Sequence, residues 1–387
     1  MEINIFKTVT IIDRENSLKY INKEGIAKLP KSITAIGKEA FYCCEQLEKI
    51  DLSECEKLGT IGDGAFKCCP SLKEVKLPKS ITAIGEEAFY SCKQLEKIDL
   101  SEFDKLETIG DRTFKYCSSL KEAKLPKSIT AIGESAFNSC EQLEKIDLSE
   151  CEKLVIIGDA AFAAFCRCSS LKEVKLPKSI TAIGEEAFHC CKQLEKIDLS
   201  ECEKLGTIGD GTFSVCKSLK EVKLPKSITA IGKEAFYCCE QLEKIDLSEC
   251  EELETIGDGT FSECKSLKEV KLPKSITAIG ESAFNSCGQL EKINLSECDK
   301  LERIDDEAFK ECEALNDSFL ASYFKRKEEK EIEVKRLKEE KLEAERKRKL
   351  KAERKLKAEE ESDKAAKIAG LILLIMFISY LILHFMI

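Results

Sequence analysis

Apolar residues recur along most of this chain in a fixed order, in units of about 24 residues. Within residues 29–52 the apolar positions are Leu29, Ile33, Ile36, Phe41, Cys44, Leu47, Ile50 and Leu52. Residues 53–77 repeat the same spacing of Ile-Gly, Phe, Cys and Leu. Ile50 and Leu52 alternate with polar residues, which is typical of a half-buried strand. One unit cannot bury its apolar face, so the pattern predicts stacked units with one continuous core.

Two units make a block of 48 residues, and the motif LPKSITAIG marks the start of each block. The motif begins 48, 48, 51, 48 and 48 residues apart, at Leu29, Leu77, Leu125, Leu176, Leu224 and Leu272. A fixed period of this kind predicts a solenoid. The one longer interval predicts a three-residue insertion around Ala163–Phe165, in a turn on the convex side.

The residues between the predicted strands indicate how each unit turns. We expect Leu-Pro to end a strand, because proline cannot donate to a ladder. We expect Ile-Gly to mark a turn, because glycine allows a positive φ. The Glu-Ala-Phe stretch favours a short helical or 3₁₀ turn.

The recurring pattern LPxSxTxIGxxAFxxCxxL resembles the BspA-like leucine-rich repeat family, over residues 29–315. The resemblance implies a surface-display, adhesion or protein-binding module. The predicted fold class is an α/β, β-rich solenoid with parallel strands on one face, then a long charged α-helix and one transmembrane helix. We expect an N-terminal cap at 1–28, about 12 repeat modules at 29–315, a charged helical stalk at 316–367 and a transmembrane helix at 368–387.

The chain has 22 cysteines, and their positions argue against a disulfide framework. Twelve lie three residues after a repeat phenylalanine, so we expect a buried column with one thiol in each turn. Five occur in SEC motifs, where Phe103 once replaces the cysteine. The other five adjoin the column and should be more exposed: Cys43, Cys68, Cys166, Cys190 and Cys238. With two histidines and no CxxC pairs, we expect no metal and no cofactor.

Charges alternate in sign from one predicted strand to the next. Because neighbouring strands lie about 4.8 Å apart, each charge should face opposite charges above and below. We interpret these charges first as a ladder of ion pairs that neutralise one another and stabilise the stacking of the units. The second interpretation is a polar face that binds a protein partner. The candidate partner-binding face consists of Glu48, Lys49, Asp51, Lys73, Glu74, Lys76, Glu96, Lys97, Asp99, Lys121, Glu122, Lys124, Glu144, Lys145 and Asp147.

Other classes of function find no support in the sequence. No stripe of one sign forms along the predicted strands, so nucleic acid is not an expected partner. The chain contains no P-loop, GxSxG or HExxH motif, and its similar units offer no singular acid–base pair. We therefore expect no catalytic residues and no enzyme activity.

The C-terminal part changes in composition after Cys312. Residues 325–367 hold 18 basic and 13 acidic residues, a net charge of +5, and most are good helix formers. Glu331–Lys335, Glu343–Lys347, Glu345–Lys349 and Glu353–Lys357 are favourable i,i+4 pairs. No sustained apolar a/d stripe is present, so we expect a solitary helix first and a coiled-coil homodimer second.

The last 20 residues, Ile368 to Ile387, contain no Asp, Glu, Lys or Arg and are long enough to span a bilayer. The first residues show no signal-peptide pattern, which favours a tail-anchored protein. The basic stalk then places the repeats in the cytosol, on an endomembrane. We expect a membrane-anchored, non-catalytic scaffold for protein partners. The alternative is a cell-surface adhesin or receptor, for which Asn294 and Asn316 would be glycosylation sites.

Overall fold

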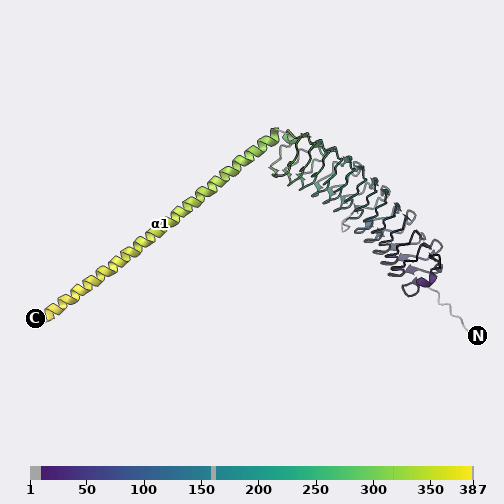
Figure 1. Cartoon of the computed structure of the whole chain (residues 1–387), viewed down its shortest axis with the longest axis horizontal. Coiled ribbons are helices and arrows are strands. Elements are labelled where there is room, and N and C mark those ends of the chain that lie inside the picture. The colour runs from purple at the N-terminus through teal and green to yellow at the C-terminus, as the bar shows by residue number, and fades with distance from the viewer. Residues whose placement is uncertain (1–9, 158–162, 317, 386–387) are drawn as a thin grey trace, which may run out of the picture. The chain divides into compact units, whose positions relative to one another are not determined.

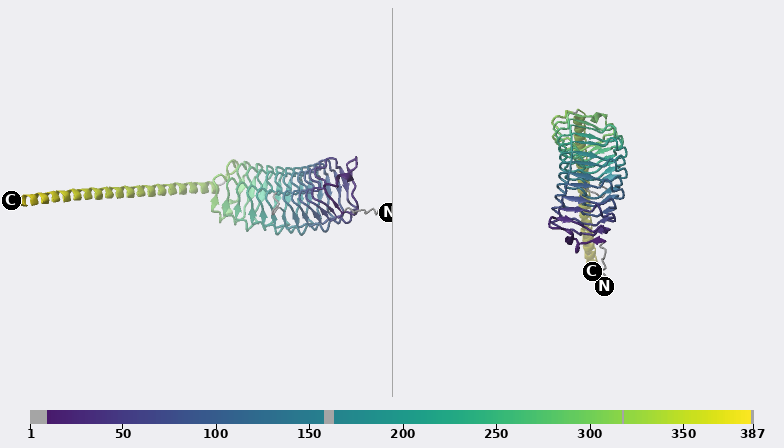
Figure 2. Two further views of the ribbon diagram at one scale, coloured as in Figure 1. Left: turned by 90° about the horizontal axis from the view of Figure 1, so that it is seen from below. Right: turned by 90° about the vertical axis from the view of Figure 1, so that its right-hand side faces the viewer.

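The computed structural model describes residues 10–157, 163–316 and 318–385. The chain separates into two compact units, Met1–Asp317 and Ser318–Ile387. The first unit is a solenoid of parallel strands with about 12 turns, and the second is one long helix (Figures 1 and 2). The predicted fold class is confirmed.

One column of strands carries the KID and EVK motifs, and we call it the charged column. Its paired members run parallel. The strands are β2 (Ile26–Ala27), β4 (Lys49–Asp51), β6 (Glu74–Lys76), β8 (Lys97–Asp99), β10 (Glu122–Lys124), β12 (Lys145–Asp147), β14 (Glu173–Lys175), β16 (Lys196–Asp198), β18 (Glu221–Lys223), β20 (Lys244–Asp246), β22 (Glu269–Lys271) and β24 (Lys292–Ile293). From β4 to β22 the middle residue is buried and its two neighbours face solvent, which confirms the predicted alternation.

A second column of two-residue strands follows the AI and TI motifs. The strands are β1 (Ile11–Ile12), β3 (Ala35–Ile36), β5 (Thr60–Ile61), β7 (Ala83–Ile84), β9 (Thr108–Ile109), β11 (Ala131–Ile132), β13 (Ile156–Ile157), β15 (Ala182–Ile183), β17 (Thr207–Ile208), β19 (Ala230–Ile231), β21 (Thr255–Ile256), β23 (Ala278–Ile279) and β25 (Arg303–Ile304). Strands of this length are too short to show a period in the sequence. The sequence analysis predicted only the charged column, so this second column of strands is an addition to the predicted fold.

The third side of each turn is not the helical turn that we predicted from Glu-Ala-Phe. Glu39 and Cys43 have positive φ angles of 52° and 55°, which interrupt any helix. Alternate N–H groups donate instead to the next turn, at 2.7–2.8 Å: Glu39 to Asp63, Phe41 to Ala65 and Cys43 to Lys67. The prediction was wrong because the neighbouring turn offers carbonyl partners that a single unit does not contain.

The core contains a column of phenylalanines that runs from Phe41 to Phe309. Rings of consecutive turns stack with centroids 5.1–5.6 Å apart. The predicted cysteine column lies beside it and is buried except at its last member, the half-buried Cys312. Each thiol from Cys69 onwards donates to the phenylalanine carbonyl of the preceding turn, as Cys69 does to Phe41 at 3.0 Å. Burial raises the pKa of Cys117 to about 12, so these thiols serve packing.

All 22 cysteines are free thiols. Cys43 is exposed and Cys68, Cys190 and Cys238 are half-buried, as expected, but Cys166 is buried. Cys166 stands two residues before the column cysteine Cys168 rather than one, so it takes a different place in its turn. The SEC cysteines are buried as well, and their thiols approach the proline carbonyl of the preceding turn.

The glycine of the Ile-Gly motif has a role other than the one predicted. Among the described glycines, positive φ occurs at Gly25, Gly64, Gly211 and Gly259, none of which follows the motif's isoleucine. A Cβ on Gly62 would lie 2.8 Å from the carbonyl carbon of Gly37. Glycine is therefore required for close contact between the backbones of successive turns.

The three-residue insertion does not lie at Ala163–Phe165. Phe165 stacks on Phe137 at 5.2 Å and on Phe188 at 5.4 Å, so it holds the ordinary place in its turn. The extra residues therefore fall between Ile157 and Ala163, within the positions outside the described residues.

The N-terminal segment forms the first turn of the solenoid. β1 pairs with β3, and β2 pairs with β4. A 3₁₀ helix, Leu18–Tyr20, lies between them. Residues 10–28 of the predicted cap thus join both strand columns, and residues 1–9 lie outside the described residues.

The second unit is the helix α1 (Ser318–Phe385), which contains the predicted stalk from residue 318 onwards and most of the predicted span without a break. Ion pairs at i,i+4 join Glu343 to Lys347 at 2.8 Å and Glu345 to Lys349 at 3.5 Å, as predicted. The C-terminal part of α1 contains one stretch that is long and apolar enough to cross a membrane. Leu373 and Met376 there are 67% and 63% exposed.

Candidate interaction surface

The structure brings the predicted partner-binding residues together on one surface. They lie on β4, β6, β8, β10 and β12 or one residue before these strands. None of their side chains is buried.

The environment of each charge depends on whether the two neighbouring strands belong to the same 48-residue block or to two different blocks. We call β4–β6, β8–β10, β12–β14, β16–β18 and β20–β22 the in-block junctions, and β6–β8, β10–β12, β14–β16, β18–β20 and β22–β24 the between-block junctions.

At an in-block junction, three rows of charges pair across the strands. In the first block Glu48 contacts Lys73 at 2.9 Å, Lys49 contacts Glu74 at 3.4 Å, and Asp51 contacts Lys76 at 3.6 Å: these pairs are the predicted ladder. The same three rows recur at all five in-block junctions. The backbone register also pairs three residues at each of them.

The electrostatics of these junctions follow from the pairs. A hydrogen bond from Lys97 lowers the pKa of Glu122. A hydrogen bond to Glu122 in turn raises the pKa of Lys124. The Ser53 hydroxyl, which donates to Asp51, lowers the pKa of that carboxyl. Each group is therefore held in its charged form near neutral pH.

The between-block junctions do not continue the ladder. Among the described residues, no ion pair joins the charged-column strands across any of the five. Backbone pairing across them is limited to Glu122 with Lys145, and to Glu269 with Lys292 and Val270 with Ile293. The expectation that each charge has partners on both sides was wrong, because the ion pairs between charged-column strands from β4 to β22 all join the two strands of one block.

The backbone shows the same asymmetry at the leucine after each strand. At in-block junctions this leucine donates its N–H to a lysine carbonyl of the next strand at 2.8–2.9 Å: Leu52, Leu100, Leu148, Leu199 and Leu247 do so. At four between-block junctions the equivalent leucine has no hydrogen-bond partner within the described ranges for either its N–H or its C=O: these are Leu77, Leu125, Leu176 and Leu224.

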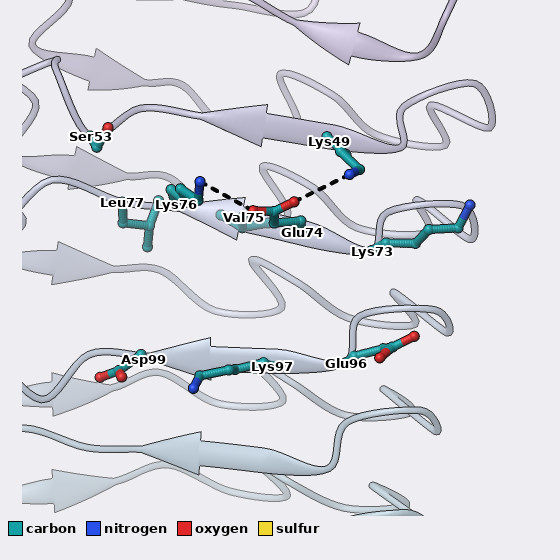
Figure 3. A pocket seen from close by; sticks show the side chains of 10 residues that line it. All are labelled: Lys49, Ser53, Lys73, Glu74, Val75, Lys76, Leu77, Glu96, Lys97 and Asp99. Carbon is teal, nitrogen blue, oxygen red and sulfur yellow. Dashed lines mark ion pairs between the residues drawn. The ribbon is translucent and has the colours of Figure 1, made fainter.

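We call these four the open junctions, and hollows lie at three of them. The hollow at β6–β8 measures about 640 Å³, with Val75 and Leu77 among its lining residues. Figure 3 shows Glu74 paired with Lys49 and Lys76, while Lys97 and Asp99 lie on the strand across the gap. Equivalent hollows of about 550 Å³ and 560 Å³ lie at β10–β12 and β14–β16. In the hollow at β10–β12, Ala123 replaces the usual valine.

The last between-block junction, β22–β24, is closed by a side chain. Asn294 stands where earlier blocks have an aspartate. Its amide oxygen accepts the Leu272 N–H at 2.7 Å, and its Nδ2 donates to the Leu272 carbonyl at 3.0 Å. Leu272 is 1% exposed, against 7% for Leu125 and 9% for Leu176, and the hollow there shrinks to about 440 Å³.

Sequence reasoning found the charged rows but missed the leucine backbone groups and the role of Asn294. The signal was present, because Asn294 is the one amide in a column of aspartates. In the described part of the chain, no group of three or more His, Cys, Asp or Glu residues could hold a metal ion. The chemistry of this surface is therefore that of ion pairs, backbone polar groups and short apolar floors.

Comparisons with known proteins agree with this architecture. A family model for the BspA type leucine rich repeat region matches six times, at residues 1–103, 34–164, 84–206, 163–250, 191–316 and 231–343. Among curated proteins, none matches the chain.

Two solved structures illustrate the likeness. A leucine rich cell surface protein from Faecalibacterium prausnitzii is 24% identical, with 80% of this chain and 82% of that chain covered and a TM-score of 0.45. A leucine-rich repeat protein from Bacteroides ovatus is 27% identical, with 77% and 88% covered and a TM-score of 0.48. From the repeated family match, which spans the whole solenoid, the chain belongs to the BspA-type leucine-rich repeat family.

Proposed function

We propose that this chain is a membrane-anchored scaffold that presents the charged column to a protein partner and catalyses no reaction. The observation that carries the proposal is the recurrence of one kind of hollow at successive between-block junctions. Charges flank each hollow but pair away from it, so a partner meets an apolar floor and free backbone groups. Repeated shallow sites of this kind suit a long protein segment better than a small molecule.

The membrane anchor is the apolar C-terminal part of α1. Its described side chains, up to Leu381, are exposed, so burial in the protein does not account for their apolar character. The preceding segment 325–367 carries a net charge of +5, which favours an orientation with the repeats on the cytosolic side.

The stalk acts as a solitary spacer in this proposal. The described side chains of residues 332–367 are all exposed, and acidic and basic residues pair along the helix. Sedimentation equilibrium in detergent should therefore give the mass of one chain. A dimer mass would favour the coiled-coil alternative.

A second candidate places the repeats outside the cell, as an adhesin or receptor. Of the two glycosylation motifs, Asn316 is exposed. The Nδ2 of Asn294, to which a glycan would attach, instead donates to Leu272. A glycan at Asn316 is thus the marker of this alternative.

Protease protection distinguishes the two orientations. A glycosylation acceptor added after Ile387 should be modified in microsomes, while the repeats remain open to protease from the cytosolic side. The matched control is Asn316→Gln in the same chain. Glycosylation that disappears in this control would contradict the cytosolic orientation.

Site-specific photo-crosslinking tests the interaction surface. A photoreactive residue at Lys97, on β8, should form protein adducts in intact membranes. The same residue at Thr108, exposed on β9 in the other strand column, should not. Equal adducts at both positions, or adducts at Thr108 alone, would contradict the assignment of the charged column.

A further inference from the structure

We propose that the four open between-block junctions bind the side-chain carboxamides of asparagine or glutamine in an extended segment of a partner protein. The inference rests on the proposed function, since it names the chemistry that the charged column recognises. The binding groups are the backbone N–H and C=O of Leu77, Leu125, Leu176 and Leu224.

The chain contains its own example of the bound state. At β22–β24, the carboxamide of Asn294 accepts from the Leu272 N–H at 2.7 Å and donates to the Leu272 C=O at 3.0 Å. One amide thus meets both polar groups of one leucine. The other four leucines occupy the same place in their blocks, and neither group of theirs has a partner in the described parts of the chain.

The aspartates at these four junctions cannot do what Asn294 does. A carboxylate has no N–H, so it cannot donate to the leucine C=O. Each aspartate is also engaged elsewhere: Asp147 Oδ1 accepts the Ser149 N–H at 3.1 Å and the Ser149 hydroxyl at 2.6 Å. Asp99, Asp198 and Asp246 make the same two contacts. The four junctions are therefore open because an aspartate stands where β24 has Asn294. One aspartate-to-asparagine substitution at each junction would close it.

The surroundings favour a neutral ligand over a charged one. At β6–β8 one wall carries Lys73, Glu74 and Lys76, and the other carries Glu96, Lys97 and Asp99. The signs of the two walls are opposite in every row, so these six charges sum to zero and favour neither a cation nor an anion. A carboxamide supplies one donor and one acceptor without charge, which matches both the leucine groups and the walls.

The spacing of the sites indicates the form of the partner. Consecutive open junctions are two strands apart, which is about 10 Å at about 4.8 Å per strand. A polyproline II segment rises 3.1 Å per residue with three residues per turn, so every third side chain lies on one face about 9.3 Å apart. The segment that fits best has asparagine or glutamine at every third residue.

The test uses the full chain in detergent micelles and fluorescent peptides with N-methylamide ends. The probe is (Pro-Pro-Asn)₄, and the controls are (Pro-Pro-Asp)₄ and (Pro-Pro-Ala)₄. We expect the asparagine peptide to bind at least about tenfold more tightly than either control, which corresponds to about 1.4 kcal/mol. Equal binding of the alanine peptide, or no binding of the asparagine peptide at roughly 1 mM, overturns the proposal.

Matched variants localise the effect. The chain with Asp99→Asn, Asp147→Asn, Asp198→Asn and Asp246→Asn supplies an internal amide to each open junction and should lose the asparagine preference. The same four positions changed to alanine lose the serine contacts without gaining an amide, and should keep it. An unchanged preference in the asparagine variant contradicts the proposal. Continued crosslinking at Lys97 would then show that only the carboxamide chemistry, and not the interaction surface, is wrong.

Discussion

Strands β4 and β6 belong to one block, whereas β6 and β8 belong to two, and the charges that could pair are the same in both cases. At the first junction, three ion pairs and a leucine N–H bond join the strands. At the second, the described residues form none of these contacts. The connecting segments differ in length, because Leu52 to Ile61 spans nine positions and Leu77 to Ile84 spans seven. Charge complementarity alone therefore does not decide which strands pair.

The largest expected effect compares a strand residue buried in the core with one that forms the floor of a hollow. Ile146 on β12 is fully buried and does not line the hollow at β10–β12, whereas Val174 on β14 lines the hollow at β14–β16 and is 6% exposed. Ile146→Ala should lower the free energy of unfolding by about 2–5 kcal/mol. Val174→Ala should cost about 1.6 kcal/mol, from two carbons at about 0.8 kcal/mol each. Urea unfolding of both variants checks this, and equal losses would mean that the floor of the hollow is packed as tightly as the rest of the core.

The next largest effect is expected from a substitution that removes the Asn294 bridge at the β22–β24 junction. Asn294→Asp leaves the Leu272 C=O without its donor, so we expect a loss of about 1–3 kcal/mol in the free energy of unfolding. Thermal unfolding followed by circular dichroism measures it. Asp246→Asn is the matched control, since it introduces an amide at the previous block and should not destabilise. A neutral Asn294→Asp would indicate that the amide bridge does not hold β22 to β24.

A smaller effect concerns the ion pairs themselves. Glu122 contacts Lys97 within its block at 2.8 Å and faces Lys145 across the open junction in register without an ion pair. A double-mutant cycle with alanine should give a coupling of about 0.2–1 kcal/mol for Lys97 and Glu122. The cycle for Glu122 and Lys145 should give a coupling near zero. Equal couplings would remove the distinction between the junctions.

The smallest effect is a dependence on pH to which the in-block pairs contribute. Their lysine partners lower the folded-state pKa of Glu74 and Glu122, so this stability is present above the unfolded pKa of about 4.3. It is lost as the pH falls through the lower folded value. The melting temperature should therefore fall between about pH 5 and pH 3, and less so in Glu122→Gln. A drop of the same size in that variant would assign the effect to other carboxyl groups.

Features that depend on the spacing of residues within one unit could be predicted from the sequence, and features that depend on contacts between turns could not. The buried positions of the strands, the cysteine column and the charged rows follow from spacing, because each depends on period and burial. The third side of each turn could not be predicted, since the N–H of Phe41 bonds to Ala65 of the next turn and not within its own unit. The open junctions were missed for a related reason. Lys73 and Lys76 have oppositely charged residues on both neighbouring strands, but across the strands they pair only with Glu48 and Asp51 of their own block. The sequence of one strand does not show which neighbour it pairs with.

Amide hydrogen exchange at the leucines tests the central comparison most directly. In the full chain labelled with ¹⁵N-leucine, Leu52, Leu100, Leu148, Leu199 and Leu247 should exchange about 100-fold more slowly than Leu77, Leu125, Leu176 and Leu224. Leu272 should belong to the slow group, and Asp147→Asn should move Leu125 into it. Similar slow exchange in all ten leucines would contradict the account, because it would mean that the between-block junctions are as fully bonded as the others.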